Sequence, residues 1–263
     1  MKSILFICLT YLNYANLIGI VKPIEDVNLS FSMDAKLMSI EIKEGDKIKI
    51  DQILMRQDSR LQKLEVQRRK LVYDDTSQID TIFKNLKLLK EMVTTKERLF
   101  KNSQTVSKAE LKRNQMQLNK MQGEYDSLAS TKIKEKLEYL ISSEILSSYF
   151  VKSPINGRVV EVKASIGEWV KTGETVVRVV DSSTCYLELN VDLTTAKILL
   201  EKQKNIFIEI TGLNETFIKK GQIKYLSTIA DTGSGWVKVK IYFDNKDLKA
   251  IPGVTAKLLF KKP

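Results

Sequence analysis

Two copies of one segment decide the fold of this chain: FSMDAKLMSIEIKEGDKIKIDQILMRQD at residues 31–58 and SPINGRVVEVKASIGEWVKTGETVVRVV at residues 153–180. The copies align without a gap at a constant offset of 122 residues. The matched pairs include Ala35 with Gly157, Leu37 with Val159, Gly45 with Gly167, Ile48 with Val170 and Arg56 with Arg178. This interrupted repeat indicates one structural unit that is built from two halves.

Each copy alternates apolar and polar residues, turns at a glycine followed by an acid, and then alternates again, which is typical of a half-buried β-hairpin. An isolated hairpin is marginally stable in water, so neither half is expected to fold alone. Two halves that face each other make a small β-sandwich. The chain leaves this unit at Asp58 and returns at Val151, so the residues between them must go out and come back.

The inserted segment, residues 59–150, is predicted to be a long α-helical hairpin. It contains no proline and a single glycine, Gly123. Its apolar residues recur at spacings that alternate between three and four, the pattern of a heptad seam. The first seam comprises Ile79, Ile82, Leu86, Leu89, Val93 and Phe100, and the second comprises Leu111, Leu118, Met121, Tyr125, Leu128, Ile133, Leu137 and Leu140. We therefore expect two arms that form an antiparallel coiled coil.

The turn of this hairpin is predicted at residues 102–107. Ser107 is followed three residues later by Glu110, which is the spacing of a capping box at the start of a helix. A turn at this place gives each arm about 40 residues and a reach of roughly 60 Å. A self-sufficient hairpin explains the seams, but it does not explain why an exported protein carries so long a rod.

The composition restricts the functions that this chain can have. It has no histidine, which removes the usual general base and the imidazole metal ligand. No glycine-rich phosphate loop or paired-acid motif stands out, so we expect no enzyme, cofactor or metal. The formal net charge is +11, but the 18 basic and 12 acidic residues of the helical insertion include no block of five like charges. Such spacing is typical of solvated helix faces and does not predict a nucleic-acid partner.

The N-terminus, residues 1–19, has the pattern of a secretory signal peptide. A lysine precedes an apolar run at residues 4–12, and small or polar residues follow it. The expected cleavage site lies after Ala15 or Gly19. The alternative is an uncleaved anchor that extends through Val21, although the apolar run is short for a membrane span.

Residues 182–263 are predicted to form a compact β-barrel. Alternating stretches lie near residues 185–191, 205–210, 222–229, 235–243 and 254–260, with a short helical piece at residues 194–202. Closing such strands on themselves leaves few exposed edges. Cys185 is the only cysteine left after removal of the signal peptide, and it is most simply a small buried apolar residue.

The two halves, residues 24–58 and 151–181, together resemble the biotinyl/lipoyl domain in their glycines, acids and alternating aliphatic residues. In carrier domains of that family, a lysine at a tight turn between the halves holds the prosthetic group. Here the long insertion replaces that turn, and the similar run at residues 32–36 lies at the start of the first half. The resemblance therefore implies the fold and disfavours a prosthetic-group carrier.

The order of the parts resembles the membrane fusion proteins, the hemolysin D-type periplasmic adaptors of tripartite efflux and secretion systems. Its better matches are KEGDKI at residues 43–48, SPINGRVVEV at residues 153–162 and LKAIPGVTAKL at residues 248–258. The resemblance implies an elongated α+β fold with a split lipoyl-like sandwich, a coiled-coil hairpin and a small C-terminal barrel. It also implies a periplasmic adaptor at the inner membrane. Such an adaptor assembles as a ring and joins an inner-membrane transporter, of resistance-nodulation-division or ABC type, to an outer-membrane channel.

In this family the hairpin tip touches the channel through Arg, Leu and Ser at spacings of four and seven. On this chain these positions fall on Lys96, Phe100 and Ser107, so only the serine is retained. We expect the three residues to serve binding and not folding. The main alternative function is a secreted coiled-coil scaffold or adhesin without a transporter. An enzyme with a lipoyl-like accessory domain ranks third.

Overall fold

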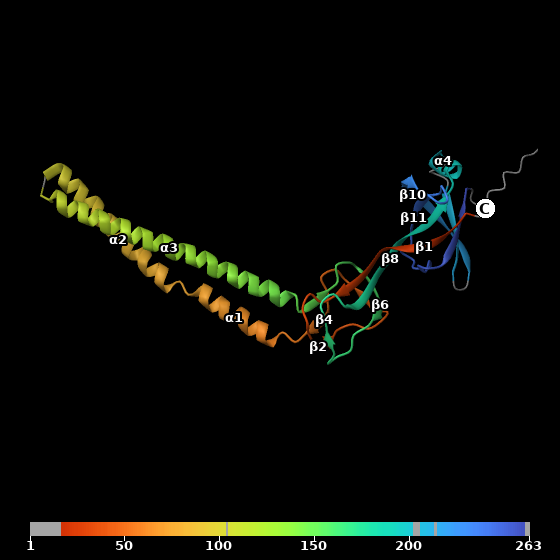
Figure 1. Ribbon diagram of the computed structural model, residues 1–263, viewed down its shortest axis with the longest axis horizontal. Coiled ribbons are helices and arrows are strands. Elements are labelled where there is room, and N and C mark those ends of the chain that lie inside the picture. The colour runs from red at the N-terminus through yellow and green to blue at the C-terminus, as the bar shows by residue number, and fades with distance from the viewer. Residues whose placement is uncertain (1–16, 104, 202–205, 213–214, 261–263) are drawn as a thin grey trace, which may run out of the picture.

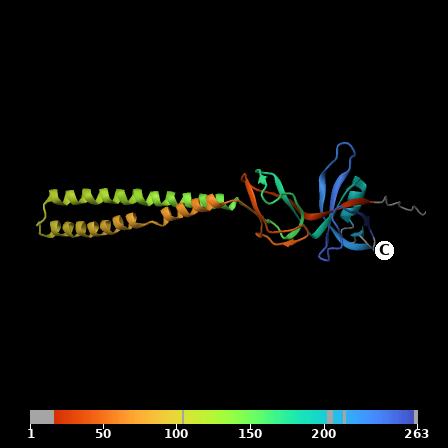
Figure 2. The ribbon, with the colours of Figure 1, turned by 90° about the horizontal axis from the view of Figure 1, so that it is seen from below.

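The computed structural model describes residues 17–103, 105–201, 206–212 and 215–260 of an elongated molecule that combines helices and sheets (Figure 1, Figure 2). Helical arms form one end, a small β unit lies in the middle and a ring of strands forms the other end. The helices are α1 (Arg60–Asp74), α2 (Ser77–Ser103), α3 (Lys108–Ser147) and α4 (Leu193–Glu201). The strands are β1 (Ile18–Ser30), β2 (Ala35–Ile40), β3 (Lys47–Ile48), β4 (Ile53–Gln57), β5 (Phe150–Lys152), β6 (Gly157–Val162), β7 (Trp169–Val170), β8 (Thr175–Val191), β9 (Ile206–Thr211), β10 (Thr216–Ala230), β11 (Val237–Asp244) and β12 (Thr255–Leu259). Residues 1–16 of the predicted signal peptide and Gln104 of the predicted turn lie outside the described residues.

The repeat found in the sequence recurs in the backbone. β2 and β6 lie 122 residues apart in the chain, as do β3 and β7, and β4 matches the first part of β8. Gly45 and Gly167 both have a φ of 92°. The Gly45 N–H donates to Val159 O at 2.9 Å. The Gly167 N–H donates to Leu37 O at 2.8 Å, so each half bonds to the other in the same way.

The two halves make one β unit because their strands pair with each other. β2 of the first half pairs with β7 of the second, and β3 pairs with β6. Asp34 Oδ1 accepts from Thr172 N at 2.7 Å, and Asn156 Oδ1, 122 residues after Asp34, accepts from Ile50 N at 3.1 Å. The buried core draws on both halves: Phe31, Leu37, Ile48, Leu54, Met55, Val151, Val159, Val170, Val177 and Val179. The predicted pairing of the two halves in one β unit is confirmed.

The two equivalent glycine turns lead to a prediction about stability. We expect Gly45→Ala and Gly167→Ala each to lower the free energy of unfolding by about 1–2 kcal/mol, because both glycines have a positive φ. A clash contributes little, since the only atom within 4 Å of either added Cβ is Lys36 Cε, at 3.8 Å from that of Gly167. Gly123→Ala in α3 is the control, and it should stabilise the chain by about 0.5–1 kcal/mol. Denaturant unfolding measures all three, and unequal losses at the two turns would contradict their equivalence.

α2 and α3 pack against each other along the part of the predicted seam nearest the tip. Leu86, Leu89 and Val93 of α2 are buried, as expected of seam residues. α3 is one helix of 40 residues, so the second arm has the predicted length. None of the helices in the described part of the chain combines the length and the apolar character that a membrane span requires.

The first arm is interrupted, which corrects the prediction of two continuous arms. α1 ends at Asp74 and α2 begins at Ser77. Asp75 Oδ1 accepts from the Ser77 N–H at 3.0 Å and from its hydroxyl at 2.6 Å, which satisfies a free donor at the start of α2. Lys132 Nζ of α3 donates to Val72 O at 3.0 Å and to Asp75 O at 2.6 Å, which satisfies carbonyls at the end of α1. A run of short polar residues thus ends one helix and starts the next.

The base half of α3 also differs from the predicted seam. The periodicity places Ile133, Leu137 and Leu140 between the arms, but these residues are 62%, 53% and 48% exposed. α1 meets α3 through other contacts, including the stacked rings of Tyr73 and Tyr139, whose centroids lie 6.1 Å apart. The aliphatic residues at the base of the hairpin are therefore left uncovered in a single chain.

A ring of strands forms the end of the molecule opposite the hairpin. β1 pairs with β12, and the order continues through β9, β10 and β11 to β8, which pairs again with β1. β1 begins at Ile18, ahead of the first half-domain that the sequence places at residue 24. Gly19 permits a close approach of two strands here, since a Cβ would lie 2.3 Å from Glu188 O. The predicted helical piece near residues 194–202 is α4.

Alternate side chains fill the ring. They include Cys185, Leu187, Leu189, Ile206, Ile208, Ile210, Val237, Val239, Ile241 and Phe243. Cys185 is fully buried, as predicted, and burial raises the pKa of its thiol to about 11. Asn245 is buried beside it, and its amide donates to Ser182 O and Ala250 O, both at 2.9 Å. These hydrogen bonds hold the loop that leads to β12.

Candidate partner-binding site at the hairpin tip

The hairpin tip is the part of the molecule farthest from the ring of strands (Figure 1). α2 ends at Ser103 and α3 begins at Lys108, so a short loop joins the two arms. The three positions predicted to bind a partner, Lys96, Phe100 and Ser107, all lie on this last part of the hairpin. Their contacts within the chain differ.

Ser107 is the N-cap residue of α3. Its backbone is extended, with a φ of −74° and a ψ of 148°, and its side-chain oxygen accepts from the Glu110 N–H at 3.1 Å. The first N–H groups of a helix have no partner within the helix, and a serine oxygen supplies one. The predicted helix start is confirmed. Ser107 is also exposed, so it is accessible to another protein while it caps the helix.

Lys96 forms an ion pair with Glu110 across the two arms. Lys96 Nζ lies 2.7 Å from Glu110 Oε1, and this hydrogen bond lowers the pKa of the glutamate below its usual value. Glu110 thus joins two predicted site residues, because its N–H bonds to Ser107 and its carboxylate bonds to Lys96. A reciprocal capping box would direct that carboxylate to the Ser107 N–H instead.

Phe100 lies one helical turn beyond Lys96 on α2 and is partly exposed. Heptad spacing alone places this ring in the seam, but its exposure leaves part of it accessible. In the described part of the chain, no group of three or more His, Cys, Asp or Glu residues is placed to hold a metal ion.

The contacts between the arms near the tip were missed from the sequence. Glu110 was identified only as a capping residue, whereas it also pairs with Lys96. Gln115 of α3 donates to Glu97 Oε1 of α2 at 2.9 Å, a second polar contact between the arms. The sequence does show complementary polar residues on the two sides of the predicted turn, and these could have indicated the contacts. Using them in this way requires the register of the two helices, which the turn position alone does not define.

The fold and the comparison with known families define the class of protein. Residues 25–182, more than half of the chain, match the model of the RND MFP barrel-sandwich hybrid domain. The chain therefore belongs to the membrane fusion protein family.

Similar proteins cover most of this chain. Multidrug resistance protein MdtA of Pantoea ananatis is 25% identical over an alignment of 245 residues, and the match covers 89% of this chain and 55% of that protein. MdtA of Pectobacterium atrosepticum is 22% identical over an alignment of 251 residues, and the match covers 91% of this chain and 56% of that protein. The chain thus spans about half the length of the curated relatives it matches.

Solved structures share the fold at low sequence identity. MacA from Actinobacillus actinomycetemcomitans has a TM-score of 0.73 at 18% identity, and the match covers 93% of this chain and 76% of that one. The membrane fusion protein Spr0693 from Streptococcus pneumoniae R6 has a TM-score of 0.58 at 16% identity, covering 95% and 99%. These likenesses show the fold.

Proposed function

We propose that this chain is a periplasmic adaptor that links an inner-membrane transporter, of resistance-nodulation-division or ABC type, to an outer-membrane channel for export. The observation that carries the proposal is the position of the split β unit between the ring and the hairpin (Figure 1). One chain thereby presents two separated ends on a connected scaffold. An adaptor between two membranes needs this arrangement.

In this proposal the two ends have different partners. The tip, with Lys96, Phe100 and Ser107, contacts the channel, and the ring lies toward the transporter. The arms act as an antiparallel coiled coil, and the ring acts as the β-barrel. α3 has 40 residues. A helix of that length reaches roughly 60 Å, so the tip is held far from the ring.

We also propose that several copies assemble as a ring of adaptors. Aliphatic side chains at the base of the hairpin support this, because Leu61 and Leu64 of α1 are 84% and 61% exposed and Leu137 and Leu140 of α3 are 53% and 48% exposed. Large apolar side chains that are exposed close together mark interaction sites in soluble proteins, and these four lie on two packed helices at the base of the hairpin. The hairpin of a neighbouring copy would cover them.

The structure sharpens the expectation for signal cleavage. We predict that the mature chain begins at Asn16, after cleavage at Ala15, and is recovered from the periplasm. Cleavage after Gly19 would remove part of β1, where Ile18 pairs with Lys257 and Leu17 O accepts from Leu258 N at 2.8 Å. Mass spectrometry of the N-terminal peptide checks the site. A mature chain that begins at Ile20 would contradict this prediction, and one that begins at Met1 would favour the uncleaved anchor.

Deleting and restoring the gene tests the proposed function. We expect the deletion to raise the accumulation of exported compounds inside the cell, and the complete chain to reverse the effect. The rival function, a secreted scaffold or adhesin, predicts unchanged accumulation of every compound tested together with altered attachment of cells. That result would contradict the adaptor proposal.

A further inference from the structure

The β-hairpin formed by β10 and β11 has an outer surface to which the proposed function assigns no role. Val237, Val239 and Ile241 of β11 point into the ring and are buried. Because side chains alternate along a strand, the residues between and beside them face outward. The outward face, as we name it, comprises Lys224, Tyr225, Ile229, Trp236, Lys238 and Lys240.

Three large side chains of the outward face are exposed to a degree unusual for their type. Ile229 is 78% exposed, Trp236 is 51% exposed and Tyr225 is 46% exposed. Ile229 lies on a bulge, since the pairing of β10 with β11 is irregular between Leu226 and Ala230. The bulge displaces the isoleucine from the regular register of the sheet.

The turn that presents Trp236 is held by its own hydrogen bonds. Asp231 Oδ1 accepts from Gly233 N at 3.2 Å and from the N–H and the hydroxyl of Ser234, both at 2.8 Å. Asp231 N donates to Trp236 O at 2.8 Å. These hydrogen bonds fix the backbone that carries the exposed Trp236 side chain before any partner arrives. A preorganised group loses less entropy when it binds.

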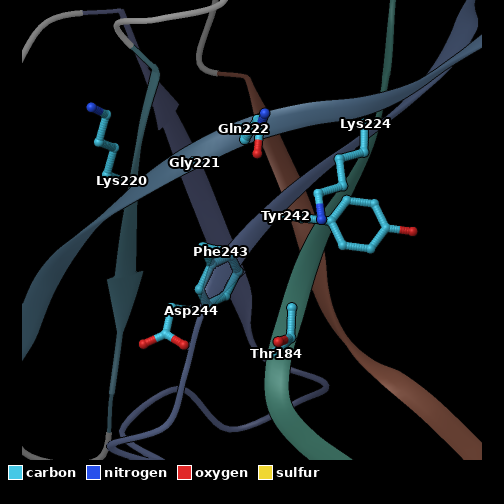
Figure 3. A pocket seen from close by; sticks show the side chains of 8 residues that line it. All are labelled: Thr184, Lys220, Gly221, Gln222, Lys224, Tyr242, Phe243 and Asp244. Carbon is cyan, nitrogen blue, oxygen red and sulfur yellow. The ribbon is translucent and has the colours of Figure 1, made fainter.

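Lysines surround these side chains. Lys240 Nζ lies 4.9 Å from the Tyr186 ring centroid and 5.5 Å from that of Tyr225, and Lys224 Nζ lies 5.3 Å from that of Tyr242. Among the described residues, no carboxylate lies within ion-pair distance of Lys224 or Lys240. Figure 3 shows Lys224 beside the Tyr242 ring in an open depression of about 600 Å³. Lys238 forms an ion pair with Glu188, at 3.8 Å between Nζ and Oε1. The outward face thus combines aromatic and aliphatic groups with lysines, of which Lys224 and Lys240 have no carboxylate within ion-pair distance among the described residues.

β1 begins at the same end of the ring as this hairpin turn. Val237 pairs with Val191 at the end of β8. Ile20 of β1 pairs with Glu188 near that end. The apolar run at residues 4–12 lies upstream of this point.

We propose that the outward face docks onto an anionic bilayer surface. Tryptophan and tyrosine favour the interface between headgroups and acyl chains, and lysines near it are attracted to anionic lipids. Ile229 adds aliphatic area at the tip of the hairpin, and Lys220 and Lys224 border a depression open to headgroups. That the surface is the outer leaflet of the inner membrane rests on the proposed function. The binding itself does not.

Flotation of the mature chain with lipid vesicles tests this proposal. We expect binding to vesicles of phosphatidylglycerol and phosphatidylethanolamine, and much weaker binding to phosphatidylcholine alone. Lys224→Gln with Lys240→Gln should weaken the binding by about thirtyfold, since each lysine contributes about a factor of five. Ile229→Ser with Trp236→Ser should weaken it by at least about tenfold.

Matched variants on the hairpin arms control for lost charge and lost apolar area. Lys112→Gln with Lys136→Gln removes two exposed lysines, and Leu88→Ser with Met116→Ser removes side chains that are 64% and 65% exposed. Both should bind vesicles like the unaltered chain. Equal binding by the outward-face variants and the controls would overturn the proposal. Equal binding to both kinds of vesicle would also overturn it. No binding to any vesicle would overturn it as well, and an acidic protein surface would then be the partner to test. No transporter or channel is present, so a failure here is separate from a failure of the adaptor function.

Discussion

Phe100→Asp is expected to abolish export while leaving the fold intact. The ring is partly buried near the tip, so its replacement should lower the free energy of unfolding by about 1–2 kcal/mol, less than the loss of a fully buried side chain. In a packed contact between helix ends, however, an unpaired carboxylate is costly. Accumulation of an exported compound and thermal unfolding of the purified chain measure the two effects. Leu89→Ala marks the opposite case, because Leu89 is buried in the seam and its truncation should cost about 2–5 kcal/mol.

Controls separate the partner contact from the helix cap. Thr94→Asp adds the same charge to an exposed position lower on α2 and should export normally. Ser107→Ala removes the cap and should cost about 0.5–2 kcal/mol, whereas Ser107→Asp retains a capping oxygen. If Ser107→Asp is as stable as the unaltered chain but fails to export, the serine serves the partner as well as the helix. Normal export by Phe100→Asp at native levels would show that the channel contact lies elsewhere.

Replacing residues 59–150 with a short glycine-containing linker should leave a cooperatively folded β protein that exports nothing. The two ends of the hairpin meet at paired strands, where Arg56 lies opposite Phe150 and Met55 opposite Val151, so a few residues close the gap. The β unit retains its whole core, because the buried residues of that core lie outside the helices. Circular dichroism during heating and an export assay check the two parts of this prediction.

The separate halves provide the complementary test. Residues 24–58 or 151–181 alone should be unstructured, since each half lacks the strands that pair with it in the complete chain. A cooperative thermal transition from either half alone would contradict the split-domain account. Mixing the two halves and recovering the transition would support it.

The split β unit could be predicted from the sequence because its sequence pattern occurs twice. The glycine turns, the alternating residues and the constant offset each occur twice, so one half checks the other. The buried seam near the tip also follows from local periodicity, as Leu86, Leu89 and Val93 show. The pairing of β1 with β8 could not be predicted, because it joins segments more than 150 residues apart, such as Asp26 and Val180.

The break between α1 and α2 shows a different limit. No proline or glycine marks it, and the residues that produce it compete with the helix only through short polar side chains and through Lys132 of the other arm. The residues at the hairpin tip could also be predicted only in part. Capping chemistry predicted the role of Ser107 in starting α3, whereas the assignment of Lys96 and Phe100 to a partner came from family resemblance. The ion pair between Lys96 and Glu110 depends on the register of the two helices.

Photocrosslinking in living cells tests the central claim most directly. A crosslinking amino acid is placed at Phe100, and the matched control places it at Thr94 on the same helix. The adaptor account predicts that position 100 captures an outer-membrane channel protein, while position 94 captures at most other copies of this chain. Capture of no outer-membrane protein from position 100, in cells whose export depends on this chain, would contradict the account.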